Sequence, residues 1–209
     1  MVKVVGFIDG FNLYHALMAK NALGKRIYKK YRWLNMWKLV ECYIYPEESL
    51  DKVYYFTASP PWSSSKKRKH RDLVKAQKKY GVHVIHGRFR PVTRKCLGSC
   101  QEEYKTYEEK RTDVNIAVKL VELTATHPFD KAILISADSD LTPAVEAAKH
   151  LNPQLKITVV TPIKLRGKAL HNVADYKRNM KPSDLKRSVL PRVITLEKDQ
   201  TITCPDGWL

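Results

Sequence analysis

Two carboxylates stand two residues apart in the stretch from Lys131 to Pro143, KAILISADSDLTP. A short apolar run leads into Ser136, Asp138 and Asp140, and the residues after them have the apolar spacing of a helix. This pattern predicts a buried parallel strand, whose carboxyl end is where open α/β sheets bind ligands. Paired carboxylates there can hold a hard divalent cation through oxygen. The alternative is helix capping, in which Asp140 accepts hydrogen bonds from the next helix.

A second acid follows another apolar run. Val2 to Ile8 predicts a buried strand that ends at Asp9. Gly10 permits a sharp turn, and Asn12 is placed to cap the next helix or to reach the site. An acid at the carboxyl end of a parallel strand repeats the arrangement of Asp138. The alternative is a simple Asx turn, which strand-end aspartates often make.

A third acid, Asp113, opens the helix predicted over Thr112 to Thr126, with Thr112 as its N-cap. Apolar residues follow Asp113 at i+3, i+4 and i+7, which places it on the inward face. They are Ile116, Ala117 and Leu120. The helix dipole favours an acid in the first turn but does not explain the inward direction. Because a buried carboxylate is costly unless it is paired or binds metal, we interpret Asp113 as functional.

The chain of 209 residues carries 38 Lys and Arg against 21 Asp and Glu, a formal charge of +17. Such a surplus indicates a polyanionic partner, which is nucleic acid or, less often, an anionic membrane surface. A hydrophobic content of 44% argues against disorder. No apolar run approaches the ~20 residues of a membrane span, and the N-terminus lacks a signal-peptide pattern. We therefore expect a cytoplasmic protein that binds no membrane.

Cations gather on the first turns of a helix predicted after residue 65. They oppose the helix macrodipole, which favours a role in binding phosphate, although a solvated charged face is the alternative. Trp62, in the preceding loop, could stack on a base, whereas we expect Trp33 and Trp37 to pack in the core or a lid. The predicted nucleic-acid contacts are Lys66, Lys67, Arg68, Lys69, Arg71, Arg88, Arg90, Lys110, Arg111 and Trp62.

The four cysteines are too scattered for a secreted disulfide framework. Cys96 and Cys100 form one C-x3-C pair, whereas tight zinc sites usually have two such pairs. Only Cys42, Cys204 or a histidine could complete the set. We therefore do not expect zinc at Cys96 and Cys100.

Strands and helices alternate along the chain, which predicts a parallel sheet with right-handed crossovers. Further strands are expected at Lys52 to Thr57, Val82 to Phe89 and Lys156 to Thr161. A helix is expected from Leu34 to Ile44. The tail from Lys181 contains short β-like pieces that could form a hairpin on the sheet edge or an interface.

Three stretches, in this order, resemble the NYN domain of the PIN-like nuclease superfamily. They are FIDGFNLYH, KRTDVNIAVKLVEL and ILISADSDLTPAVEAAK, and the resemblance covers about residues 2 to 162. It implies a three-layer α/β/α PIN-like (Rossmann-like) sandwich around a mainly parallel sheet. We expect a nuclease domain over residues 1–180 and a β-rich tail, 181–209, packed on that domain or at an interface.

The resemblance also implies hydrolysis of RNA phosphodiester bonds with Mg²⁺ or Mn²⁺. The metal positions carried over by motif are Asp9, Asp113, Asp138 and Asp140, with Asn12 and Ser136 in support. Family members often have a further Asp where this chain has Lys119, which leaves open one metal or two. The expected function is thus a metal-dependent ribonuclease, and the alternative is a catalytically weakened RNA-binding module. The partner is RNA, and a homodimer remains open.

Overall fold

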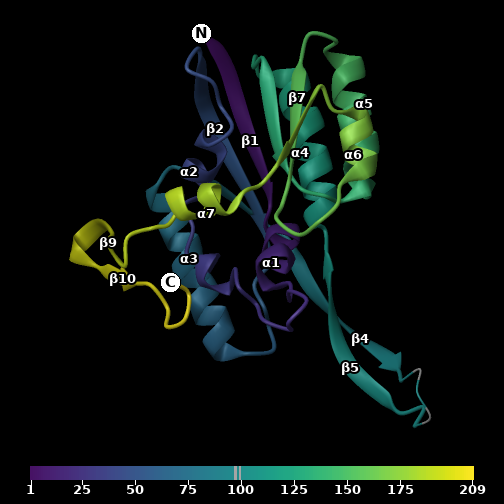
Figure 1. Cartoon of the computed structure of the whole chain (residues 1–209), viewed down its shortest axis with the longest axis vertical. Helices are drawn as coiled ribbons and strands as arrows, with labels where there is room; N and C mark the ends of the chain where they lie inside the picture. Colours follow the sequence, from purple (N-terminus) through teal and green to yellow (C-terminus); the bar gives the residue numbers. More distant parts are fainter. Residues whose placement is uncertain (97, 99) are drawn as a thin grey trace.

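The computed structural model describes residues 1–209 except 97 and 99. A six-stranded sheet lies at its centre, in the order β3-β2-β1-β6-β7-β8, and every neighbouring pair of strands is parallel (Figure 1). The strands are β1 Val2–Asp9, β2 Glu48–Thr57, β3 His83–His86, β6 Lys131–Ile135, β7 Lys156–Thr161 and β8 Tyr176–Asn179. The chain builds outward from β1 to β3 and then crosses over to β6. The strand order therefore reverses between β1 and β6.

Helices cover both faces of the sheet, so the predicted three-layer sandwich is confirmed. One face carries α1 Gly10–Met18, α2 Met36–Glu41 and α7 Pro182–Arg187. The other carries α4 Thr112–Thr126, α5 Thr142–Leu151 and α6 Lys168–Val173. A seventh helix, α3 Ser64–Lys79, lies on the α2 side, where the Gln77 side chain accepts from the Met36 amide and donates to the Leu34 carbonyl. Short 3₁₀ helices occupy Lys29–Arg32, Ser139–Leu141 and Glu197–Asp199.

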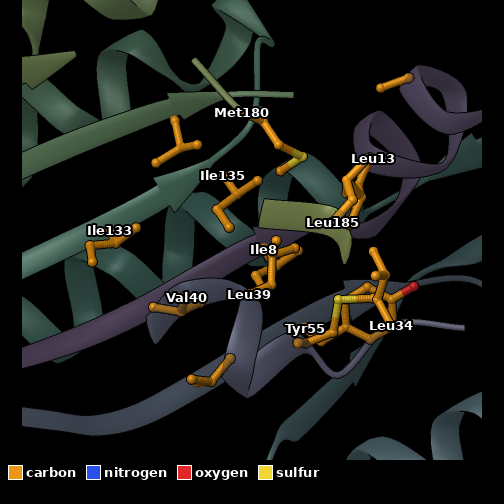
Figure 2. Packing of buried hydrophobic residues seen from close by; sticks show 14 of the residues in the cluster. Ile8, Leu13, Leu34, Leu39, Val40, Tyr55, Ile133, Ile135, Met180 and Leu185 are labelled. Atoms are coloured by element: carbon orange, nitrogen blue, oxygen red, sulfur yellow. The ribbon is translucent and has the colours of Figure 1, made fainter. Parts of the chain in front are cut away.

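Strand β1 is buried on both sides, as its continuous apolar sequence predicts. Successive side chains point to opposite faces, so Val4 and Ile8 pack under α1 and α2 while Val5 and Phe7 pack under α4 and α5. Figure 2 shows the first of these clusters, with Ile8 among residues from the sheet and the helices. Strand β1 is thus packed between the two hydrophobic clusters, which fix the position of its carboxyl end.

A β-hairpin extends away from the sandwich, and we call it the arm (Figure 1). It consists of β4 Arg88–Lys95 paired antiparallel with β5 Glu103–Lys110. The prediction of one strand from Val82 to Phe89 is therefore wrong, because the sheet strand ends at His86. A side chain on Gly87 would place Cβ 2.6 Å from both Glu109 Oε1 and Thr112 Oγ1, so only glycine fits this break. Strand β5 was not predicted. Cys96 follows β4 and Cys100 precedes β5, and both cysteines are free.

The tail contains the predicted hairpin, which lies on the domain. Val193–Thr195 (β9) and Thr201–Thr203 (β10) form the expected hairpin, but it packs against α3 and Trp33 and not on the sheet edge. Trp33 is fully buried and donates to the Pro191 carbonyl at 2.8 Å, which confirms core packing for this residue. The helix expected over 34–44 is shorter than predicted. None of the helices in the described part of the chain has the length and apolar character of a membrane span.

Candidate active site

The reversal of strand order between β1 and β6 creates a topological switch point, where the carboxyl ends of two adjacent strands diverge into helices on opposite faces. Asp9 is the last residue of β1, and Ser136 follows the last residue of β6. A Cβ on Gly10 would lie 2.4 Å from the Phe56 carbonyl oxygen, so the turn after Asp9 requires glycine. The backbone thus brings two of the three sequence motifs together.

Three carboxylates converge at this point. One oxygen from each of Asp9, Asp113 and Asp138 lies within 4.8 Å of the other two. Asp9 is only 2% exposed, and Asp113 and Asp138 are partly buried. They come from β1, from the first turn of α4 and from the loop after β6, so residues distant in sequence form one acidic cluster.

Asn12 and Ser136 hold this cluster in place. The backbone N–H of Asn12 donates to Asp9 Oδ1 at 2.9 Å, and the Ser136 hydroxyl donates to Asp9 Oδ2 at 2.8 Å. Ser136 Oγ also accepts from the Asp138 amide at 3.1 Å, and Asn12 Oδ1 accepts from the Ala137 amide at 3.0 Å. The loop that carries Asp138 is therefore bonded directly to the residues that orient Asp9.

Two of the three clustered acids also cap helices. Asp9 is the N-cap of α1, and Asp138 is the N-cap of the short helix Ser139–Leu141. Asp138 Oδ1 accepts from the Asp140 amide at 3.0 Å, so Asp138 and not Asp140 is the capping acceptor. Each capping carboxylate still has free lone pairs, because a carboxylate has about four acceptor sites.

Asp113 is positioned by an unusual helix start. The predicted N-cap, Thr112, is instead the first helical residue, and the N-cap is Arg111 with φ 81°, a left-handed conformation that is rare outside glycine. Glu109 accepts hydrogen bonds from the Thr112 amide and hydroxyl and so replaces the missing cap. Ile116 and Leu120 are buried, which confirms that Asp113 lies on the inward side.

Burial and mutual repulsion disfavour the ionised form of two of the three acids. Burial raises the pKa of Asp9 from 3.8 to about 7. The hydrogen bonds from Asn12 and Ser136 lower this pKa, whereas the negative charges of Asp113 and Asp138 raise it further. Burial likewise raises the pKa of Asp113 to about 6, helped by Asp138, Glu109 and Asp140. Among the described residues, no Lys, Arg or His forms an ion pair with the three acids.

These observations fit a cation site. Three converging carboxylates supply hard oxygen donors, which suit Mg²⁺ and Mn²⁺. A buried, unpaired acid such as Asp9 is expensive in a folded protein unless a cation or a proton neutralises it. The donor set and its surroundings therefore match a divalent metal ion.

The comparisons with known proteins agree with this geometry. The family model of the NYN domain matches residues 3–181, most of the chain. The chain belongs to the NYN domain family. This places it in the PIN-like nuclease superfamily, as the three motifs indicated.

Two individual proteins are similar to this NYN domain. The 6-hydroxy-3-succinoylpyridine 3-monooxygenase HspA of Pseudomonas putida (strain DSM 28022 / S16) is 26% identical over 243 aligned positions, which cover 97% of this chain and 74% of the relative. A crystal structure of a protein of unknown function from Vibrio parahaemolyticus matches with a TM-score of 0.54 and 16% identity, over 90% of this chain and 96% of that one. At that identity, the second likeness concerns the fold alone.

Two predicted positions lie outside the acidic cluster of the NYN domain. Asp140 is exposed and is not one of the three converging acids, although its charge contributes to the raised pKa of Asp113. Lys119 points to Glu122, whose carboxylate lies 2.6 Å from its ammonium group, and sits over the Tyr54 ring. Its ammonium group is thus already paired with Glu122.

The basic residues among the predicted nucleic-acid contacts lie on α3, on the two strands of the arm and at the start of α4. The cluster at residues 66–71 occupies the first two turns of α3, as predicted. Arg88 and Arg90 lie on β4 of the arm and are exposed. Lys110, at the end of β5, pairs with Glu108 at 3.1 Å, and Arg111 forms the start of α4. Their role in binding remains a prediction.

Sequence reasoning singled out Trp62 but missed the rings that accompany it at the base of the arm. We call this group the aromatic cluster: Phe11, Trp62, Phe89 and Tyr107. The Trp62 ring centroid lies 4.7 Å from that of Phe89 and 5.0 Å from that of Tyr107, and Phe11 lies 6.3 Å from Phe89. Trp62 is 43% exposed and Phe11 39% exposed. Phe11 stands two residues after Asp9, so the cluster begins next to the acids. Glu109 was missed as well, because β5 was not predicted.

Proposed function

We propose that this NYN domain is a metal-dependent ribonuclease that hydrolyses RNA phosphodiester bonds. The observation that carries the proposal is the convergence of Asp9, Asp113 and Asp138 at the switch point, with their oxygens within 4.8 Å and no basic partner among the described residues. The family match supports hydrolysis of nucleic acid. The charge of +17 supports a polyanionic substrate.

The acids have distinct roles in this proposal. Asp9, Asp113 and Asp138 hold Mg²⁺ or Mn²⁺, and Asn12 and Ser136 fix Asp9 and the Asp138 loop by the hydrogen bonds described above. Asp140, which is exposed beside Asp113, orients the attacking water or contributes to a second ion. A bound divalent ion neutralises developing charge on the phosphate and makes a water molecule more acidic.

The basic and aromatic residues bind the strand. Side chains on α3 and β4 contact phosphates, which supply most of the affinity for a nucleic acid. Trp62 offers an exposed ring on which a base can stack. Since every base has a face that can stack, these contacts suit single-stranded RNA of varied sequence.

Cleavage assays with purified protein test the proposal. Single-stranded and structured RNA are incubated with Mg²⁺, Mn²⁺ or EDTA, alongside DNA of the same sequence. Wild type is expected to cleave RNA only with metal, and Asp138→Asn to lower the rate about 100-fold or more, since each 1.4 kcal/mol of lost stabilisation costs a factor of about ten. Asp206→Asn, a change at an exposed acid in the tail, is the matched control. Cleavage that persists in EDTA and in Asp138→Asn comes from another site or from a contaminant.

An RNA-binding module without turnover is the second candidate, favoured by Lys119 at a position where relatives often carry an acid. It predicts salt-sensitive binding of RNA and no cleavage. Titration with Mn²⁺ separates the two candidates, because a cation site stabilises the folded state as metal is added. A binding-only protein shows no such rise in its melting temperature.

The Pseudomonas relative suggests a further candidate, because the alignment with that monooxygenase covers 97% of this chain. Monooxygenation of a pyridine by this chain is tested by following consumption of 6-hydroxy-3-succinoylpyridine. Consumption of the pyridine without any metal-dependent cleavage of RNA would replace the nuclease assignment.

A further inference from the structure

A basic pocket opens close to the acidic cluster. It has a volume of about 370 Å³ and lies between the start of α3 and the carboxyl ends of β2 and β3. Lys67, Arg68 and Arg71 line it from α3, and His70 and His86 complete its wall. Strand β2 lies directly beside β1, in a register that pairs Phe56 with Asp9. Because neighbouring strands are about 5 Å apart, the pocket lies on the order of 10 Å from Asp9.

The cations of this pocket lack counter-charges in the described part of the chain. Lys67 and Arg68 form no ion pair there, and Arg71 meets only the carboxylate of its neighbour Asp72, at 3.5 Å. The first turn of α3 contains no acid. Since cations near a helix N-terminus oppose its dipole, this arrangement is unfavourable until an anion binds.

The two histidines contribute hydrogen-bonding groups and little charge. His70 Nε2 lies 2.8 Å from the Thr57 hydroxyl oxygen, which fixes the ring at the end of β2. Burial lowers the pKa of His70 to about 4, and burial also lowers the pKa of His86. Both rings are therefore neutral near pH 7, and the positive charge of the pocket comes from three side chains.

We propose that this pocket binds the terminal phosphate monoester of an RNA strand. A monoester carries nearly two negative charges at neutral pH, whereas an internal phosphodiester carries one. Three cations therefore match a terminal phosphate better than a bridging one. A pocket also accepts a chain end more readily than a phosphate from which the polymer must continue in both directions.

The surroundings give the strand a route to the acids. Trp62 stands two residues before the start of α3, and the aromatic cluster continues through Phe89 to Phe11, beside Asp9. A strand whose end is fixed in the pocket can stack its first bases on these rings and bring a nearby phosphodiester to the acidic cluster. The inference rests on the proposed function for the polymer and for the cleavage step, but the phosphate site itself does not require catalysis.

Binding measurements in EDTA test the site without any hydrolysis. One short RNA is prepared with a 5′-phosphate, with a 3′-phosphate and with neither, and its Kd is measured by fluorescence anisotropy. Wild type is expected to bind at least one phosphorylated form about tenfold more tightly, the usual size of one charge-assisted contact. Millimolar inorganic phosphate should remove this preference. The preferred form identifies which end of the strand the pocket takes.

Two double variants of equal charge provide the comparison. Lys67→Ala/Arg68→Ala should bind all three RNAs alike. Lys156→Ala/Arg192→Ala, with changes at exposed cations that do not line the pocket, should keep the preference. The site is overturned if wild type binds the three RNAs equally or if both double variants lose the preference. A phosphate preference without metal-dependent cleavage leaves the pocket standing and removes the nuclease, and cleavage without a preference does the reverse.

Discussion

Replacing Asp113 with Asn should stabilise the metal-free protein. The rise of the Asp113 pKa from 3.8 to about 6 corresponds to about 3 kcal/mol when the carboxylate is ionised. Because Asp113 is only partly buried, solvent screening reduces this to about 1–2 kcal/mol. Asn has nearly the same shape and no charge, and among the described residues Asp113 accepts no hydrogen bond that the change would break.

The sign of this effect depends on pH. Well below pH 3.8, Asp113 is protonated in the folded and the unfolded chain, so its charge costs nothing. Above its folded pKa of about 6 it is ionised in both states, and the full electrostatic cost falls on the folded state. The stabilisation by Asn should therefore be small near pH 4 and complete at pH 8, provided that the metal is chelated.

Thermal unfolding in EDTA at these two pH values is the assay. A gain of about 1–2 kcal/mol in a domain of this size raises the Tm by about 2–8 °C. Asp206→Asn, in the exposed tail, should leave the Tm unchanged. Addition of Mn²⁺ should then reverse the order, since wild type gains about 2.7 kcal/mol at 100 times its Kd and the variant gains much less. An Asp113→Asn protein that is less stable than wild type in EDTA at pH 8 would falsify the electrostatic account of the cluster.

Three further results are expected. Affinity for Mn²⁺ should rise as the pH passes from about 6 to above 7, because Asp113 and Asp9 must lose protons that compete with the metal. Calorimetric titration at several pH values measures the affinity, and an affinity that does not change with pH contradicts the prediction. Ser136→Ala removes one hydrogen bond to Asp9 and leaves the Asp138 backbone amide without its acceptor. It should cost about 1–3 kcal/mol of stability, measured by denaturant unfolding, and lower Mn²⁺ affinity about 10–100-fold, measured by metal titration. Unchanged affinity would show that Ser136 does not support the metal site. Trp62→Ala should weaken binding of single-stranded RNA about tenfold without changing the salt dependence of binding, because a stacked base contributes about 1–3 kcal/mol. The control is Tyr176→Ala, at an exposed ring on β8. Equal losses of affinity in both variants would argue against stacking on Trp62.

The sequence was informative where chemistry sits at the end of an apolar run. Asp9 and Asp138 follow runs that can only be buried strands, and parallel strands place such residues at one edge of a sheet. Asp113 was recognisable because an acid on the apolar side of a helix needs a reason to be there. These positions depend on local pattern, and the structure brings all three together.

The arm was not readable for a physical reason. Strand β5, EYKTYEEK, packs neither face into the core, so it shows no alternation of apolar and polar residues. The break at Gly87 depends on Glu109 and Thr112, which lie more than twenty positions further along the chain. The start of α4 was mistaken for a different reason. Its capping group is Glu109, only three residues before Thr112, but it belongs to the strand β5 that was not predicted. The basic pocket also depends on distant parts of the chain, because His70 of α3 is held at Thr57 of β2, which lies next to His86 of β3.

The arm joins the body at a single place, since Arg88 at its first position is paired with Lys110 at its last. The polypeptide leaves the sandwich after β3 and returns to it just before α4, with the order of the six core strands undisturbed. Insertions, deletions or exchanges in the outer part of this hairpin leave the order of the sheet unchanged, whereas its base must keep Glu109, which caps α4. A foreign hairpin should therefore be grafted beyond Phe89 and before Tyr107, so that Glu109 and the helix start that carries Asp113 are kept.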